Sequence, residues 1–227
     1  LIEYLVRHKH TSPLEMCSVT FCMKMPVAIC RQLLRHRTGK FNEFSQRYTE
    51  VPEEDGRFKL NNTFTSFRTK SKINKQSSEL IQDEKQMFEL NDMMIEMEKK
   101  QDEVFSLYKA MLEKGLAKEL ARFYLPLSTY TTIYVQFDLN NLMKFLQLRC
   151  AEDAQFEIQV YANAMKELVS QFFPICMGMF NQYQNSIYLG KYKKQMIKER
   201  KIPDEVTSRS LRASLKDLAS ELGIELE

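Results

Sequence analysis

The sequence lacks the features of a membrane-inserted or disulfide-bonded protein. No run of apolar residues approaches the length needed to span a bilayer, and no signal-peptide pattern opens the chain. The five cysteines are an odd number without a Cys-x-x-Cys pair, which argues against a disulfide framework and against a zinc site. These absences predict a protein of the reducing cytoplasm with no membrane partner and no bound metal.

A large excess of charge is also lacking. The 33 basic and 30 acidic residues leave a net charge of +3, which excludes the strong overall field of a nonspecific DNA-binding protein. Positive charge therefore matters only where it clusters. The 227 residues are enough for one domain with a sizeable core. Because the chain begins at Leu1 rather than Met, we expect further residues upstream.

Positive charge clusters in residues 31–48, where Glu43 is the single acidic residue. Arg31 and Arg35 are four residues apart, so on a helix they would lie one turn apart on the same face. Three more cations follow in the segment: Arg37, Lys40 and Arg47. Crowded guanidinium groups repel one another unless an anion holds them, and arginine binds phosphate or carboxylate through two donors. The cluster predicts a polyanionic small ligand; the alternative is a solvated basic helix face.

Hydrophobic periodicity predicts both strands and long helices, in a chain whose length favours a single domain. Strands are expected at residues 18–25 and 131–137. Helices are expected at residues 1–8, 26–37, 79–114, 116–124, 142–173, 191–201 and 203–223. The helix at 79–114 carries apolar residues at seven-residue intervals, which is typical of a core or subunit-packing helix. An acidic turn at 51–56, a short strand at 57–60 and a polar surface loop at 61–78 lie between.

Two helix starts carry recognisable capping residues. Ser12 is the expected N-cap of a helix that begins at Pro13, with Glu15 reaching back to close a capping box. Residues 138–141 supply capping side chains for the helix at 142–173. Arg149 then falls in the middle of that helix, where an arginine usually packs its stem and keeps its head in water.

The basic segment resembles the signature of the flavin-dependent thymidylate synthases, which is Arg-His-Arg, seven residues and Ser. The matching residues are Arg35, His36, Arg37, Asn42, Glu43, Ser45, Arg47 and Tyr48. A second segment resembles the family's His-x-(Ser/Thr)-Pro-x-Glu pattern through His10, Ser12 and Glu15. The likeness extends over residues 1–173, apart from the polar loop at 61–78.

The resemblance implies a fold, a reaction, a cofactor and partners. The fold is α+β, with a small antiparallel sheet and long packed helices in a single domain. The family converts dUMP to dTMP, with 5,10-methylenetetrahydrofolate as the one-carbon donor and NADPH as the reductant acting through FAD. The family also forms homotetramers whose active sites are shared between subunits. On this basis residues 1–190 are expected to form the catalytic domain and residues 191–227 a basic C-terminal helical extension. The family usually has an N-terminal strand before the first residue of this chain.

The resemblance also implies roles for individual residues. Those expected to bind dUMP are Gln32, Arg35, Glu43, Ser45, Gln46, Arg47, Arg122 and Arg149. Those expected to bind FAD are Ser12, Arg35, His36, Arg37, Asn42, Glu43, Asp138, Asn140 and Lys144. Arg149 matches the catalytic arginine credited with polarising the uracil, and Arg122 matches one that binds the nucleotide phosphate from another subunit.

The sequence departs from the family pattern at three of these positions. Where the family commonly has Asn-x-Arg and then Asn, this chain has Asp138, Asn140 and Lys144. A buried carboxylate facing an electron-rich flavin is unfavourable. Asp138 is therefore expected to point to solvent, to cap the following helix or to pair with Lys144.

Two other classes of protein could explain parts of the pattern. A nucleic-acid-binding module would use the same arginines on phosphates, but the slight net charge and the lack of a recognisable nucleic-acid motif argue against it. A purely structural helical assembly protein would explain the seven-residue repeats but not the cluster at 31–48. A nucleotide-binding enzyme accounts for both features.

Overall fold

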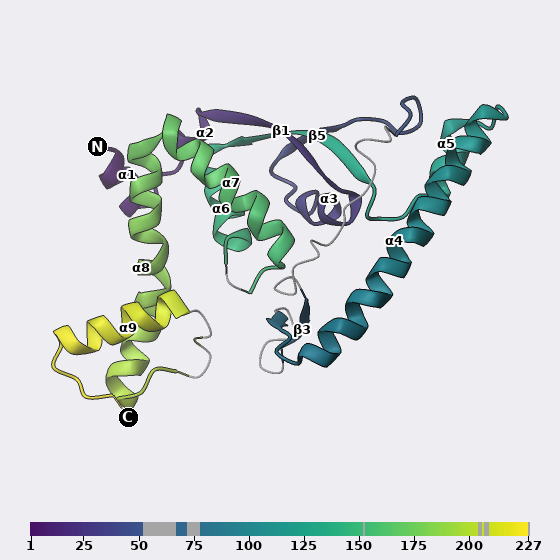
Figure 1. Ribbon diagram of the computed structural model, residues 1–227. Coiled ribbons are helices and arrows are strands. Elements are labelled where there is room, and N and C mark those ends of the chain that lie inside the picture. The colour runs from purple at the N-terminus through teal and green to yellow at the C-terminus, as the bar shows by residue number, and fades with distance from the viewer. Residues whose placement is uncertain (52–66, 72–77, 152, 204–205, 207–208, 227) are drawn as a thin grey trace. The chain divides into compact units, whose positions relative to one another are not determined.

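The computed structural model describes the whole chain except residues 52–66, 72–77, 152, 204–205, 207–208 and 227. The described residues form two compact units, one of residues 1–19 and 138–227 and the other of residues 20–137 (Figure 1). The expected strand at 57–60 lies outside the described residues, as does the acidic turn beyond Val51. The expected combination of a small sheet with long helices is confirmed.

A three-stranded sheet organises the unit of residues 20–137. Its strands are β1 (Ser18–Pro26), β2 (Lys40–Glu43) and β5 (Tyr130–Asp138), in the order β1-β5-β2. Antiparallel pairing of β2 with β5 places Lys40 opposite Gln136 and Glu43 opposite Ile133. Alternate residues of β5 are buried, as the apolar alternation indicated. The two expected strands are confirmed, whereas β2 was not predicted, because four residues are too few to show a period.

Glycine at position 39 allows β2 to approach the core of this sheet. A Cβ atom at Gly39 would lie 2.7 Å from the ring of Phe137 and 2.8 Å from the ring of Phe41. Those two rings pack edge to face, with centroids 6.1 Å apart. The chain therefore needs a residue without a side chain immediately before β2.

The long helix of this unit starts later than the sequence suggested. It is α4 (Glu84–Glu113), and the side chain of Asp83 caps it by accepting hydrogen bonds from the backbone N–H groups of Lys85 and Gln86. Gly115, at a φ of 83°, closes its C-terminal end as expected. The predicted start at residue 79 was wrong, because residues 78–80 pair with another segment instead of joining the helix.

That pairing forms a hairpin within the expected polar loop at 61–78. Strands β3 (Arg68–Lys70) and β4 (Ser78–Leu80) are antiparallel, with Arg68 opposite Leu80. Phe67 and Ile81 flank the hairpin and are buried. The described part of this region is therefore not a simple surface loop, and pairing between strands rather than local composition decides its structure.

Short helical segments complete this unit. They are α3 (Val27–Leu33), α5 (Lys118–Ala121) and a 3-10 turn, η2 (Arg122–Tyr124). Tyr108 and Phe105 of α4 form a small core with Val51 and Ala121, and the Tyr108 hydroxyl accepts a hydrogen bond from the backbone N–H of Val51. This core joins the chain after the basic segment to the helices that carry Arg122.

The unit of residues 1–19 and 138–227 is helical. Its helices are α1 (Ile2–Arg7), α2 (Ser12–Glu15), α6 (Leu139–Arg149), α7 (Phe156–Phe172), α8 (Pro174–Glu199) and α9 (Arg209–Glu221). Helix α8 packs against α1, α7 and α9, and α2 packs against α6. The expected boundary at residue 190 stays a prediction and falls within α8.

The expected helix at 142–173 is two helices. Helix α6 ends at Arg149 and α7 begins at Phe156. In the break, the side chain of Gln159 donates a hydrogen bond to the backbone carbonyl of Ala154 at 2.6 Å. The intervening residues favour helices locally, so tertiary packing of α6 against α7 decides the break.

The C-terminal residues pack within the chain itself. Val206 and Leu215 are buried in a cluster with Tyr192 and Met196 of α8. All five cysteines carry free thiols. In the part of the chain that the structure describes, no helix is both long enough and apolar enough to cross a membrane.

Candidate active site

The basic segment leaves its helix earlier than expected. Helix α3 ends at Leu33, so Arg35 and Arg37 lie beyond it and the predicted helix through residue 37 was wrong. Tight turns follow, with the backbone N–H of Arg35 bonded to the carbonyl of Gln32 and that of His36 to Leu33. The chain has to leave the helix here to enter β2 after Gly39. Arg35 and Arg37 are thereby exposed, while Gln32 and His36 are half-buried.

Strand β2 fixes two of the expected ligand-binding residues on the sheet. Asn42 lies opposite Tyr134 and Glu43 opposite Ile133. The carboxylate of Glu43 accepts a hydrogen bond of 2.6 Å from the hydroxyl of buried Thr131. Sequence reasoning missed Thr131 as a partner of Glu43, because the contact joins residues 88 positions apart.

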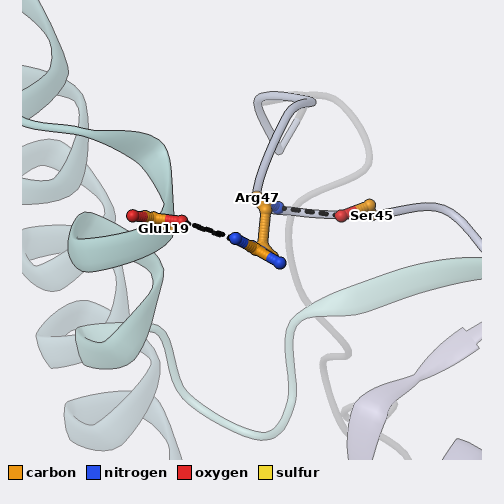
Figure 2. Close-up of polar contacts among 3 residues, drawn as sticks. All are labelled: Ser45, Arg47 and Glu119. Carbon is orange, nitrogen blue, oxygen red and sulfur yellow. Dashed lines mark hydrogen bonds and ion pairs between the residues drawn. The ribbon is translucent and has the colours of Figure 1, made fainter.

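A turn after β2 presents the end of the signature. The hydroxyl of Ser45 accepts a hydrogen bond from the backbone N–H of Arg47 at 3.3 Å, and the backbone N–H of Tyr48 bonds to the Ser45 carbonyl. Ser45 and Gln46 are half-buried, whereas Arg47 is exposed. The turn fixes the main chain around Ser45, and the Arg47 side chain points toward Glu119 (Figure 2).

Arg47 holds a carboxylate from another element. Its Nε and Nη2 atoms lie 3.2 Å and 3.1 Å from the same oxygen of Glu119 on α5 (Figure 2). Arg122, half-buried at the start of η2, follows Glu119 by three residues. The structure thus brings Arg47 to the segment that contains Arg122. Glu119 was not singled out from the sequence, because nothing in its local pattern sets it apart.

Helix α2 carries Ser12 in the helical unit. Ser12 is the first residue of this helix and is exposed, while Thr11 occupies the N-cap position without a side-chain cap bond. The expected Ser12 cap was therefore wrong. The Glu15 carboxylate instead accepts hydrogen bonds from Asn140 at 3.0 Å and from Thr11 at 3.5 Å.

Asp138 caps helix α6, which is one of the three roles expected for it. Its two carboxylate oxygens accept hydrogen bonds from the backbone N–H and the side-chain amide of Asn141, at 2.8 Å and 2.6 Å. The amide oxygen of Asn141 in turn accepts a hydrogen bond of 3.4 Å from Lys144. Asp138 and Lys144 are thus connected through Asn141.

Arg149 is the last residue of α6 rather than a mid-helix residue, which corrects the expected position. It is half-buried, and removal from water lowers the pKa of its guanidinium below the ordinary value. A cation at the C-terminal end of a helix is stabilised by the partial negative charge of the last carbonyl groups.

The thiol nearest the signature is not set up as a nucleophile. Burial raises the pKa of Cys30 from 9.0 to about 12, and the negative charge of Glu43 adds to the effect. Cys30 is therefore a neutral thiol at physiological pH. Within the described residues, no cluster of three or more histidines, cysteines and carboxylates could hold a metal ion.

Fold and site together define an α+β protein with exposed cations arranged around a small sheet. The chain belongs to the flavin-dependent thymidylate synthase family, because the family model described as "Thymidylate synthase complementing protein" matches residues 1–175. The family suggested by residues 35–48 is thus confirmed.

Curated relatives agree with this family. A flavin-dependent thymidylate synthase from Thermus thermophilus is 42% identical over 184 residues, covering 81% of this chain and 63% of that protein. One from Treponema denticola is 39% identical over 188 residues, covering 82% of this chain and 68% of that protein. The chain thus spans a little under two thirds of the length of the Thermus relative.

A solved structure resembles the fold. The UMP/dUMP methylase PolB from Streptomyces cacaoi, bound with 5-Br dUMP, aligns with a TM-score of 0.69 and 29% identity. The alignment covers 80% of this chain and 77% of PolB.

Each unit by itself offers donors suited to an anionic cofactor such as a flavin dinucleotide. Arg35 and Arg37 are exposed cations of the unit of residues 20–137. In the helical unit, Lys144 is an exposed cation and Ser12 offers an exposed hydroxyl. Arg47, in the same segment as Arg35 and Arg37, forms an ion pair with the carboxylate of Glu119.

Proposed function

We propose that this protein is a flavin-dependent thymidylate synthase that converts dUMP to dTMP. The methyl group comes from 5,10-methylenetetrahydrofolate and the reducing equivalents from NADPH through FAD. The observation that carries the proposal is the complete signature at residues 35–48, which follows α3 and keeps Arg35, Arg37 and Arg47 exposed. A nucleotide phosphate, a flavin pyrophosphate and a folate tail are all anionic, which explains why a nearly neutral protein gathers its arginines here.

The dUMP site comprises polar side chains and cations from residues 32–47 together with Arg122 of another subunit. Arg47 binds the phosphate, and the carboxylate of Glu119 is a stand-in for that anion. Ser45, Gln46 and Gln32 hydrogen-bond to the nucleotide. Support comes from the Ser45 turn, in which the Ser45 hydroxyl holds the backbone N–H of Arg47.

The FAD site comprises Arg35, His36 and Arg37 with Asn42 and Glu43. Four residues of the helical unit are separate candidates: Ser12 and Lys144 for direct contact with FAD, and Asp138 and Asn140 for holding that segment in place. When bound, FAD supplies the hydride, which no side chain can deliver. The Thr131 hydroxyl holds the Glu43 carboxylate in one orientation, so that a ligand meets a preformed acceptor.

Arg149 is the catalytic residue in this proposal. Its guanidinium stabilises negative charge that develops on the uracil ring as C5 attacks the one-carbon unit. Partial burial supports the role, because a cation with less water around it interacts more strongly with nearby charge. No proton transfer by Arg149 is needed.

A homo-oligomer, in the family a homotetramer with shared sites, is the proposed assembly. The exposed apolar side chains of α4 support it. The most exposed are Phe88 at 59%, Met93 at 63%, Met97 at 54% and Leu107 at 63%. Apolar side chains at this density are typical of a surface that packs against another subunit. The cytoplasmic location suggested by the cysteine pattern stays a prediction.

An absorption spectrum of the purified protein tests the function. We expect a flavin spectrum that bleaches when NADPH is added without oxygen, and dTMP formation when dUMP and methylenetetrahydrofolate are both present. The Arg37→Ala variant should lose flavin while keeping its circular dichroism spectrum. A protein that stays colourless after incubation with FAD would contradict the proposal.

A further inference from the structure

The segment that presents Ser12 cannot hold its own position. Helix α2 has four residues and no side-chain cap bond. A single helical turn of this length is unstable in isolation, since nucleation costs more than one turn of hydrogen bonds returns. Its geometry must therefore come from contacts with the rest of the helical unit.

Contacts with the start of α6 supply that support. The side-chain amide of Asn140 donates to the Glu15 carboxylate at 3.0 Å, and the backbone N–H of Leu139 donates to the carbonyl of Cys17 at 2.9 Å. Leu14, between Ser12 and Glu15, is 8% exposed. The Asn140–Glu15 bond thus connects α2 to α6, and the Leu139–Cys17 bond connects the chain just after α2 to the same helix.

The bond between Asn140 and Glu15 is the strongest side-chain contact in this set. Asn140 is 7% exposed, so its amide has few water molecules to replace a lost partner. The acceptor is a carboxylate, and charge-assisted hydrogen bonds are about twice as strong as neutral ones. Losing either side chain therefore removes the side-chain hydrogen bond that joins Glu15 of α2 to Asn140 of α6.

Asp138 caps the N-terminal end of α6. Both of its oxygens accept hydrogen bonds from Asn141, two residues after the helix begins, and these bonds hold residues 138–141 in place. The first residues of α6 are thus bound to each other and to α2. They form a preformed support rather than a set of free ligands.

We propose that Glu15 and Asn140 are positioning residues for FAD, with Asn140 acting through Glu15 on the Ser12 segment instead of touching the cofactor. This inference rests on the proposed function. It gives Glu15 a role that the signature residues alone do not indicate. It also explains how an asparagine at position 140 serves the site where the family commonly has an arginine.

A double-mutant cycle on FAD affinity tests the pair. Glu15→Ala, Asn140→Ala and the double variant are titrated as apoprotein with FAD, following flavin fluorescence. We expect each single variant to bind FAD about tenfold more weakly, the loss typical of one charge-assisted hydrogen bond. The double variant should lose no more than either single one, because both remove the same contact.

Two further variants separate positioning from general damage. Glu15→Gln keeps an oxygen that can accept from Asn140 and should bind FAD nearly as the parent does. Glu167→Ala removes an exposed carboxylate from α7 and should leave FAD affinity unchanged. At saturating FAD, the affinity for dUMP should be the same in all variants. A variant whose whole fold is destabilised would bind dUMP more weakly as well.

Direct contact between Asn140 and FAD predicts a different pattern. In that case Asn140→Ala weakens binding while Glu15→Ala does not, or the two losses add in the double variant, and either result overturns the proposal. Hydrogen exchange of the backbone amides at residues 11–17 gives a readout without FAD. Exchange should accelerate in both alanine variants and not in Glu15→Gln. Unchanged exchange in the alanine variants would also overturn the proposal. Failure of the parent protein to bind FAD, with exchange as expected, would instead refute the proposed function.

Discussion

The guanidinium of Arg47 donates two hydrogen bonds to a single carboxylate oxygen of Glu119, although the two residues are 72 positions apart. The two side chains are 51% and 50% exposed, so water and salt weaken the ion pair. An anionic ligand that binds the same two donors of Arg47 has to displace the carboxylate. The pair therefore links the basic segment of the signature to the helical segment that carries Arg122.

Glu119→Gln should tighten dUMP binding, because it removes both the competing charge and its repulsion of the phosphate. An exposed pair contributes about 1 kcal/mol or less, so we expect a dissociation constant lower by about fivefold or less. Titration calorimetry at low and high salt measures the dissociation constant of dUMP, and the gain in affinity should be smaller at high salt. Glu113→Gln, at the exposed end of α4, is the charge-matched control. Weaker binding in Glu119→Gln would show that the carboxylate orients Arg47 instead of competing for it.

Arg149→Ala should lower turnover while leaving FAD bound. The guanidinium acts on charge that forms in the transition state, and removing one such group costs about 10²- to 10³-fold in kcat. Single-turnover kinetics with the flavin spectrum as reporter separates the two effects. Arg149→Lys keeps the charge but not the planar guanidinium, so its activity should lie between that of the parent protein and that of Arg149→Ala. Unchanged turnover in the alanine variant would remove the proposed role.

Cys30 should make the protein less stable at alkaline pH. The folded state raises the pKa of this thiol to about 12 from 9.0. Above pH 9.0 the unfolded chain releases the thiol proton while the folded chain keeps it, so the stabilisation is complete below pH 9.0 and is lost as the pH rises toward 12.

Urea unfolding at about pH 8 and about pH 10.5 measures this loss of stability. Cys30→Ala should show a smaller fall between the two pH values than the parent protein. Ellman's reagent supplies a second check at the lower pH. Exposed Cys22 should react and buried Cys30 should not. Equal pH dependence in the parent and in Cys30→Ala would contradict the assignment.

Gly39→Ala should destabilise the sheet that carries Asn42 and Glu43. Its Cβ would lie 2.7 Å from the buried ring of Phe137, closer than real contacts allow. We expect a loss of about 1–3 kcal/mol in the free energy of unfolding, as for other overpacked cores.

Gly178→Ala is the matched control for that change. Position 178 lies within α8, with nothing within 4 Å of an added Cβ, so alanine should stabilise by about 0.5–1 kcal/mol. Chemical denaturation of both variants gives the comparison. A Gly39→Ala protein as stable as its parent would mean that the two rings can move apart freely.

Local patterns anticipated much of the fold. Alternating apolar residues predicted β1 and β5, because the period of a strand depends on neighbouring residues. Gly115 predicted the end of α4, because glycine readily adopts the left-handed backbone that ends a helix. The role of Asp138 as a helix cap was also among the roles expected for it. These features depend on contacts within a few residues of each other.

Other elements could not be read in this way. The β3–β4 hairpin and the break between α6 and α7 go against local helix or loop preference, because pairing and packing with distant segments outweigh propensities of less than about 1 kcal/mol per residue. Helix α3 ends at Leu33 for a similar reason, since the chain must turn to place β2 beside β5.

The sequence by itself determined the family and the chemistry that its side chains can perform, because the signature at residues 35–48 is a matter of residue identity and spacing. Only the tertiary structure decided which partners those side chains meet. Glu119 on Arg47, Thr131 on Glu43 and Asn140 on Glu15 are contacts between residues far apart in the chain. Such contacts depend on how elements pack, and no local pattern of charge or apolarity encodes them.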